Sequence, residues 1–504
     1  MALNDITIVR GQGGLGRALD GEDYYSGMLF FNDDAPYYGG RQILSLQQAE
    51  NFGITNNYSD ISASTTTVTI TDVGSTGDVA IISQNEPTTG YVTLCNYSIE
   101  AGATTDVLQA TAIANAINNG TRTHGYSAVA SSNDIMITAP KRLGVWLNTY
   151  GISLSSTGDL SLSATSWSAG TASMNAICHY HISEYFRLQP NGNLWVYFAE
   201  ISGNAYNFAE LGYMQGLAQG KVRQVGVYIA NTGANVVSDI TAVAGGIQAQ
   251  CNTLESLHQP MSVVAALDMY DTNATSLVDL GTMDYRSVSI TIGQDGRNLG
   301  NQLFYSANYS ITNMGAVLGA ISLAAVNESI AWVSKFNMTN GIELSTPALA
   351  NGDIIDMVGN ANLLSQLNLY RYLFLRTFVG ISGTFINDNP CAITESSDYA
   401  YINDNRVIDK AHRLLYAGVL PFLNGTIRLN ADGTLTLVTI SYVQGLAQNA
   451  LDAMVRAGEI SAYQILIDPA QDVLTTSMLY ITANIVPTGV ARHITINLGF
   501  VTSI

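Results

Sequence analysis

Potential metal ligands gather in one short segment, Cys178-His179-Tyr180-His181, and Glu184 follows closely behind it. Thiolate, imidazole and carboxylate groups are the ligands that zinc prefers in proteins. In a strand, however, His179 and His181 would point to one face and Cys178 to the other, so the three ligands would not converge. No second ligand group at zinc spacing occurs elsewhere in the chain. We therefore predict a structural histidine pair at a sheet surface and no metal site.

A glycine pattern near the N-terminus has the spacing of a dinucleotide-binding loop. Gly11, Gly13 and Gly16 satisfy G-x-G-x-x-G after a strand-like segment, Ile6 to Val9. In a dinucleotide site this loop opens a helix whose N-terminus faces the pyrophosphate. Here the following residues, Arg17 to Gly21, end in an Asp-Gly turn signal. The sequence favours a flexible loop, and we predict no bound cofactor.

Four aspartates, Asp268, Asp271, Asp279 and Asp284, are the remaining candidates for acid/base chemistry or a calcium site. Their spacing matches no calcium loop, so solvated loop carboxylates are the expectation. The chain also contains no G-x-S-x-G elbow, no H-E-x-x-H helix and no phosphate-binding G-x-x-x-x-G-K-[ST] loop. We predict no catalytic residues and a protein that is not an enzyme.

Composition narrows the class further. The chain has 504 residues, of which 47% are hydrophobic and only 12% are charged, so it should fold into several domains. Such a weakly charged surface is tolerated where large areas become subunit contacts. The net charge of -19 disfavours direct binding to nucleic acid, because affinity for the phosphate backbone comes largely from Lys and Arg.

Cysteine spacing and apolar runs point away from disulfides and membranes. The four cysteines form no C-x-x-C pair, which fits reduced thiols in a cytoplasm, and the N-terminus lacks a secretory signal. The uncharged run from Met314 to Val326 is too short to cross a bilayer, so we expect a buried helix and no membrane insertion. Its Gly315 and Gly319 favour close helix packing inside a core.

The pattern of helices and strands that must position these residues predicts an α/β fold, more fully an α+β multidomain fold. We expect four parts. They are an N-terminal arm and the start of a core at 1–58, a β-rich inserted outer domain at 59–175, an α/β middle domain at 176–355, and a C-terminal assembly domain with a terminal arm at 356–504. An aromatic strand, Tyr24 to Phe31, opens the core. In the outer domain we predict strands at Thr66 to Thr71 and Asp134 to Thr138, and a helix at Val107 to Ile117.

In the middle domain, strand and helix patterns alternate along the chain. The predicted strands are Gln224 to Ala230, Met261 to Leu267 and Ser287 to Ile292, and the predicted helices are Ala242 to Leu257 and Met314 to Trp332. Alternation of this kind is typical of parallel strands with covering helices.

The C-terminal part combines two helices with three strands. One helix places Val407, Ala411, Leu414 and Leu415 on one face and is expected to be capped at Ser397 or Asp398. The second, from Val443 to Val455, should stop at Gly458. The predicted strands are Tyr463 to Ile467, Leu479 to Val486 and His493 to Phe500.

The last of these strands has one apolar face. Ile494, Ile496, Leu498 and Phe500 alternate with polar or small residues, and Pro487 to Gly489 separates them from the strand before. No later segment is available as a partner. The strand could therefore pair within its own domain or with another subunit.

Three runs of this part, Gly383 to Asp388, Ser397-Asp398-Tyr399 and Asn405 to Ala411, resemble the C-terminal region of contractile bacteriophage tail sheath proteins. The similarity continues through Met454 to Ile460 and the terminal strands. Gly315 to Val333 and Asp23 to Gly27 also resemble members of that family, whereas the β-rich domain does not.

The resemblance implies a subunit that forms hexameric rings. The rings would stack helically around a tail tube protein, and the stack would contact baseplate and tail terminator proteins at its ends. Contraction would drive the tube through the host envelope, and the virion, assembled in host cytoplasm, would be the location. Terminal arms would be exchanged between subunits, with Gly11, Gly13, Gly14 and Gly16 as a hinge. The exchanged strand residues would be Ile6, Ile8, Ile494, Ile496, Leu498 and Phe500.

Two other interpretations stay open. The first is the sheath of a phage-like contractile injection device. The second is an α/β enzyme with a β-rich glycan-binding domain, suggested by the alternating middle segment.

Overall fold

The structure is a computed structural model of the chain. It describes residues 23–32, 35–56, 63–86, 90–140, 147–148, 150–170, 174–200, 206–229, 240–266, 277–301, 303, 311–339, 341, 343–355 and 357–500. Helices and strands are mixed throughout, which confirms the expected combination of α and β structure.

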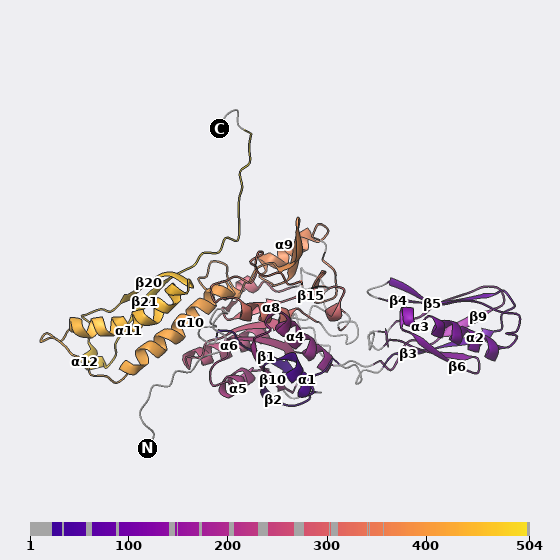
Figure 1. Cartoon of the computed structure of the whole chain (residues 1–504), viewed down its shortest axis with the longest axis horizontal. Coiled ribbons are helices and arrows are strands. Elements are labelled where there is room, and N and C mark those ends of the chain that lie inside the picture. The colour runs from indigo at the N-terminus through magenta and orange to yellow at the C-terminus, as the bar shows by residue number, and fades with distance from the viewer. Residues whose placement is uncertain are drawn as a thin grey trace, which may run out of the picture.

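A six-stranded sheet forms the centre of the molecule (Figure 1), in the order β14-β12-β11-β1-β10-β2. These strands are β1 (Tyr25–Phe31), β2 (Gly39–Ile43), β10 (Asn193–Ala199), β11 (Gln224–Ile229), β12 (Ser262–Ala266) and β14 (Val288–Thr291). All neighbouring pairs are parallel except β10 with β2. The parallel arrangement predicted from the alternating pattern is confirmed.

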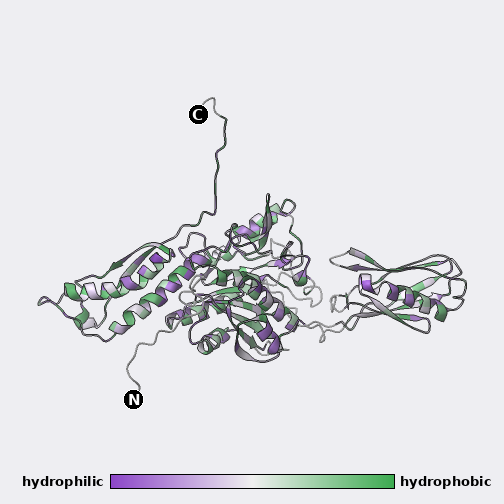
Figure 2. Ribbon diagram, in the orientation of Figure 1, coloured by the Kyte–Doolittle hydropathy of each residue, from purple (hydrophilic) through white to green (hydrophobic). Residues whose placement is uncertain are grey.

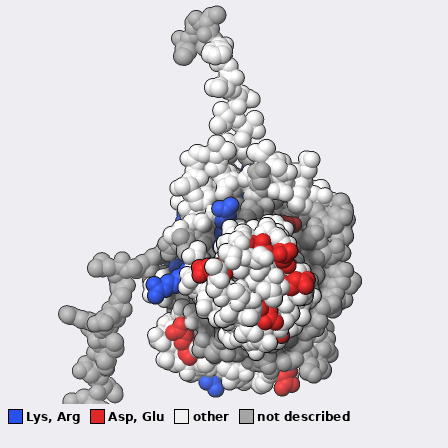
Figure 3. All heavy atoms as spheres, turned by 90° about the vertical axis from the view of Figure 1, so that its right-hand side faces the viewer, with Lys and Arg blue, Asp and Glu red and all other residues white. Residues whose placement is uncertain are grey.

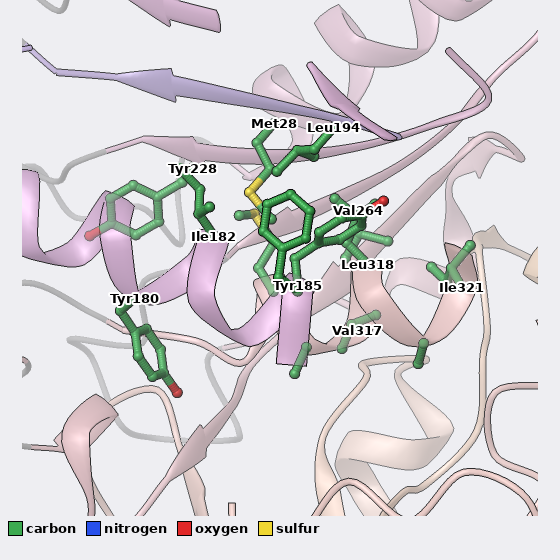
Figure 4. Packing of buried hydrophobic residues seen from close by; sticks show 14 of the residues in the cluster. Met28, Tyr180, Ile182, Tyr185, Leu194, Tyr228, Val264, Val317, Leu318 and Ile321 are labelled. Carbon is green, nitrogen blue, oxygen red and sulfur yellow. The ribbon is translucent and has the colours of Figure 1, made fainter. Parts of the chain in front are cut away.

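Helices cover both faces of this sheet. Successive side chains of β1 point to opposite faces, and since both sets are apolar, each face needs a covering layer. Met28 and Phe30 pack in one cluster with α4 (Met174–Leu188) and α8 (Met314–Leu323). Leu29 and Phe31 pack in a second cluster with α5 (Ala209–Leu217) and α6 (Ile240–Ser256). Figure 4 shows Tyr185 of α4 and Leu318 of α8 beneath the strands.

The β-rich domain lies at one end of the molecule (Figure 1) and has its own hydrophobic core. One sheet has the order β6-β7-β3-β9 and the other β5-β4-β8. Its elements are β3 (Thr65–Asp72), β4 (Val79–Glu86), β5 (Gly90–Ser98), α2 (Asp106–Asn119), α3 (Thr121–His124), β6 (Ser127–Ser131), β7 (Asp134–Thr138), β8 (Ser153–Ser156) and β9 (Ser161–Ala164). The two strands and the helix predicted here are confirmed.

Short elements connect the central sheet with the C-terminal part. They form three two-stranded sheets, which pair β13 with β19, β15 with β16, and β17 with β18. These strands are β13 (Asp284–Tyr285), β15 (Gly293–Asp295), β16 (Pro347–Leu349), β17 (Leu375–Phe378), β18 (Ile381–Ile386) and β19 (Ala392–Ile393), and the helices of the same region are η6 (Leu280–Thr282) and α9 (Ala361–Leu369). The short helix α1 (Leu46–Asn51) follows β2 and packs on α4.

At the opposite end from the β-rich domain (Figure 1), two long helices, α10 (Ile402–Val419) and α11 (Leu437–Arg456), lie side by side. Figure 2 shows hydrophobic and hydrophilic residues alternating around both of them. The hairpin of β20 (Ile460–Leu466) and β21 (Thr482–Pro487) covers α11, and the core they share includes Val407, Leu451 and Ile465. Two short helices complete this part, η7 (Leu420–Phe422) and α12 (Val473–Thr476).

Several predicted elements differ from the structure. The segment Cys178 to His181 is helical, not a strand, because Cys178, His181, Ile182 and Tyr185 recur at helical spacing along the buried face of α4. The helix predicted from Met314 to Trp332 ends at Leu323.

The predicted caps of α10 are also wrong. The N-cap is Tyr401, whose side chain accepts no capping hydrogen bond. Ser397 instead closes the preceding turn, where its hydroxyl accepts from the amide of Tyr399 at 3.2 Å. The end of α11 agrees with the prediction. The helix stops just before Gly458, which takes the left-handed conformation with φ of +72°.

Candidate assembly surface

The last described residues, 488–500, form an extended segment that leaves the body of the molecule (Figure 1). They are in no strand, so the predicted strand from His493 to Phe500 does not pair within this subunit. The sequence left open whether this strand pairs within its own domain or with another subunit. The structure does not form the pairing within the domain.

The apolar face of this segment is in solvent. The exposed fractions are 78% for Ile494, 80% for Ile496, 97% for Leu498 and 109% for Phe500. Burial of one such side chain is worth about 1.5–3 kcal/mol, so four together strongly favour a partner surface. An extended segment with a row of exposed apolar residues is stabilised when it joins the edge of a sheet as an additional strand.

The root of the segment is fixed to the body at two places. The side chain of Asn327 donates a hydrogen bond to the Thr488 hydroxyl at 3.1 Å. Four residues later, the Arg492 guanidinium lies 3.3 Å from the ring centroid of Tyr401 and 3.3 Å from a carboxylate oxygen of Asp388. Beyond the second of these places every described residue, 493–500, is exposed.

The hairpin of β20 and β21 has room for further strands. Its inner face packs on α11 through residues such as Ile465 and Ile485, while Gln464 and Asn484 of the outer face are exposed. Within the described part of the chain no third strand joins this sheet. Both outer edges consequently present backbone donors and acceptors, and a two-stranded sheet gains stability when strands are added.

More exposed apolar residues lie at the end of the two long helices that is remote from the central sheet (Figure 1). Leu437 and Val438 open α11, and Leu474 belongs to the neighbouring α12; their exposed fractions are all above 70%. Large exposed apolar patches mark interaction surfaces in folded proteins. This end is a second candidate contact face.

A buried charge network connects α10 with the start of β1 and the start of β20. The ammonium of Lys410 lies 2.6 Å from a carboxylate oxygen of Asp23 and 2.7 Å from one of Glu459. Arg413 contacts the other oxygen of Asp23 at 2.8 Å. Burial makes such pairs costly to break, because one unpaired charge would then remain in the interior. The network holds α10 and the hairpin against the central sheet.

Asp409 on the same helix is surrounded by charge. Burial raises the pKa of Asp409 to about 7, and the guanidinium of Arg413 acts in the opposite direction. On the neighbouring turn, Nε2 of His412 lies 3.0 Å from Nδ1 of His258, whose ring stacks on Tyr416 with centroids 3.7 Å apart. Burial and the nearby His258 lower the pKa of His412.

The candidate metal ligands from the sequence do not converge. In α4, Nε2 of His179 lies 3.1 Å from a carboxylate oxygen of Glu50, while Glu184 pairs with Arg187. Burial lowers the pKa of His181 to about 3. Throughout the described ranges no three His, Cys, Asp or Glu side chains are grouped so that they could hold a metal ion.

The other candidates have ordinary structural surroundings or lie outside the structure. Asp279 accepts a hydrogen bond from the Gly281 amide and caps η6. Asp268 and Asp271 lie outside the described residues. So do the predicted arm residues Ile6 and Ile8 and the predicted hinge, Gly11, Gly13, Gly14 and Gly16.

Sequence reasoning missed the residues that anchor this region. Arg406, Lys410 and Arg413 follow one another at i, i+4 and i+7 on α10, and in a chain with 12% charged residues that basic stripe is a usable signal. Asp23 and Arg492 had no such signal, because their partners are remote in the sequence.

The β-rich domain adds a different surface. In the view of Figure 3, acidic side chains gather on the end of the molecule that this domain forms. Its described residues include Asp72, Asp78, Glu100, Asp134 and Asp159. Like the net charge of the whole chain, this face disfavours polyanions such as nucleic acid. No described helix combines the length and the apolar character that a bilayer crossing requires.

The architecture is therefore that of a mixed α and β protein with a mostly parallel central sheet and an exposed, extended C-terminal segment. Comparison with protein families assigns nearly the whole chain. Residues 3–390 match the N-terminal domain of DUF2586 and residues 398–504 match its C-terminal domain, so the chain belongs to the DUF2586 family. No curated protein matches it.

Solved structures with some likeness come from contractile assemblies. One is the six-fold symmetrised baseplate of the anti-feeding prophage, with 15% identity, 64% of this chain and 80% of that chain covered, and a TM-score of 0.43. Another is the contracted sheath complex of the extracellular contractile injection system PVC, with 12% identity, 65% and 80% covered, and a TM-score of 0.41. The anti-feeding prophage baseplate in the contracted state gives 17%, 64% and 84%, and 0.41.

Proposed function

We propose that this protein is the structural subunit of a contractile tail sheath, which polymerises as stacked hexameric rings around a tail tube. The observation that carries the proposal is the C-terminal segment, whose four apolar side chains alternate along an extended backbone and remain exposed in the single subunit. A monomer gains nothing from such a segment, whereas a polymer gains a strand for each contact. The sheath-like runs in the C-terminal part of the sequence support the same function.

The acceptor in this proposal is the hairpin of β20 and β21 in another copy. Main-chain hydrogen bonds along one open edge would supply affinity, and the alternating side chains would extend the apolar layer over α11. The donor and acceptor lie on the same chain and on different surfaces, so the contact is heterologous and generates rings or helical polymers.

Contraction would follow from the way these parts are connected. The donated strand would stay paired while the backbone changes direction where the strand joins the Arg492 anchor, so neighbouring bodies could rotate without separating. An extended lattice that changes to one with better subunit contacts releases stored conformational energy. The work requires no bond chemistry, and the same geometry would serve a phage tail or a phage-like injection device.

The direct test compares the full chain with one that ends at Arg492. We expect the full chain to form rings or long polymers at high concentration in electron microscopy and light scattering. The shortened chain should remain dispersed, because the donated strand is gone.

The truncation should leave folding intact, since the described residues it removes, 493–500, are exposed. Circular dichroism and the melting temperature of the two chains provide that control. Polymers of equal length from both chains, or a full chain that stays monomeric at every concentration, would rule out strand donation by this segment.

A further inference from the structure

The contacts of Arg492 are those of a built binding site on the subunit's own body. Its guanidinium lies over the Tyr401 ring, with 3.3 Å to the centroid, and its Nε is 3.3 Å from Oδ1 of Asp388. An Nη2 group donates to the side-chain oxygens of Asn389 at 3.5 Å and Asn403 at 3.4 Å. A cation held by an aromatic face and a carboxylate together is bound more firmly than an exposed ion pair.

The partners of Arg492 are themselves fixed in place. Asn389 donates to Asn403 at 2.9 Å, and the Asn389 amide donates to Asp388 at 2.8 Å. The guanidinium of Arg371 also lies against the Tyr401 ring, with its carbon 5.2 Å from the centroid. The site therefore does not need to reorganise when the arginine enters it, which keeps the cost of ordering low.

The position of the site divides the C-terminal segment into two parts. Before Arg492 the segment contacts the body at Thr488, which accepts a hydrogen bond from Asn327. Residues 493–500 extend beyond the anchor and span about 26 Å at roughly 3.3 Å per residue. Loosening the anchor would lengthen the free segment and let its register slip against an acceptor strand, since register decides which face is buried.

We propose that Arg492 is a positioning residue that anchors the C-terminal segment to its own subunit and thereby sets where the free strand begins. The role of the free strand rests on the proposed function. The anchor itself does not, because it is a contact within one subunit and can be measured there.

Trypsin provides that measurement. Arg492 is the sole lysine or arginine between residues 457 and 504, so cleavage after it releases a defined peptide. The protease must draw the arginine side chain into its specificity pocket, which requires the side chain to leave the Tyr401 site. The cleavage rate therefore reports how often the anchor opens. It is followed by mass spectrometry on protein dilute enough to scatter light as single subunits.

We expect the wild type to release the peptide slowly, and Tyr401→Ala and Asp388→Asn to release it about ten times faster. Tyr401→Phe keeps the ring and should behave as the wild type, a rescue that a general loss of stability would not produce. Asp398→Asn, which changes an exposed carboxylate just before α10, is the charge control.

Equal rates in all five proteins would overturn the proposal. So would a wild-type rate as high as that of a free peptide with the sequence of residues 488–497. If Tyr401→Ala fails to fold, Asp388→Asn decides alone. A full chain that shows slow cleavage yet never polymerises would leave the anchor standing and reject the sheath function.

Discussion

Gly315 shows how closely single residues are fitted into this core. It lies where α8 crosses α4, and a Cβ there would stand 2.0 Å from the carbonyl oxygen of His181. One turn later, a Cβ on Gly319 would stand 2.8 Å from the carbonyl oxygen of Tyr185. The G-x-x-x-G spacing is explained by this close approach of two buried helices, as the sequence favoured, and not by a membrane.

Gly315→Ala should consequently destabilise the protein by about 1–3 kcal/mol, because backbone has to move to admit the methyl group. The matched control is Gly212→Ala in α5, where a new Cβ meets nothing within 4 Å. That change should be neutral or stabilising by up to about 1 kcal/mol. Denaturant melts of the three proteins test both; equal destabilisation by the two substitutions would contradict the packing described.

At the scale of elements, α10 is the part to which distant segments attach. Its first turn holds Arg492 from the C-terminal segment, and its middle holds Asp23 from the start of β1 through Lys410. Further along, His412 contacts His258, which follows α6. These contacts connect the C-terminal part of the molecule with segments that adjoin the central sheet.

Asp409 of α10 makes the stability of the folded protein depend on pH. Its pKa rises from an ordinary value of 3.8 to about 7 on folding, so the folded state holds a proton that the unfolded state has lost. Between about pH 4 and pH 7 the wild type should therefore lose stability as the pH rises. Asp409→Asn removes this pH dependence, and its stability relative to the wild type should increase by about 2–3 kcal/mol from pH 5 to pH 8.

Thermal melts at both pH values check this, with Asp398→Asn as an exposed control. Parallel curves for the wild type and Asp409→Asn would show that the carboxylate ionises in the folded protein as easily as in water.

The sequence predicted local elements well where the pattern was long, as in the strands and helices from Gln224 to Ile292 and in α11. It failed at Cys178 to His181, where two histidines at strand spacing outweighed the helical recurrence of Ile182 and Tyr185. The cap of α10 was missed because Ser397 serves an earlier turn.

Contacts between remote residues were beyond sequence reasoning. Arg492 and Asp388 lie 104 positions apart, and Arg413 and Asp23 lie 390 apart. No local pattern encodes such pairs, because the fold alone brings them together. The apolar alternation of the C-terminal segment is visible in the sequence, whereas its pairing as a strand stays a prediction and its anchor required the structure.

In the whole molecule, the central sheet lies between the β-rich domain, which has its own core, and the part formed by α10, α11 and the β20–β21 hairpin (Figure 1). The exposed C-terminal segment extends from this second part. The β-rich domain carries an acidic surface (Figure 3), whereas exposed apolar residues gather at the C-terminal part. This division fits the proposed sheath, in which the C-terminal parts would join the subunits.

The central claim is that the segment after Arg492 enters another copy as a strand, and a pair of substitutions tests its two-residue period. Ile496→Asp places a charge on the apolar face, whereas Thr495→Asp places the same charge on the opposite face. Electron microscopy of the two proteins at equal concentration should show polymers for Thr495→Asp and dispersed subunits for Ile496→Asp. Equal polymerisation of both, or loss of polymers in both, would contradict pairing as a strand with one buried face.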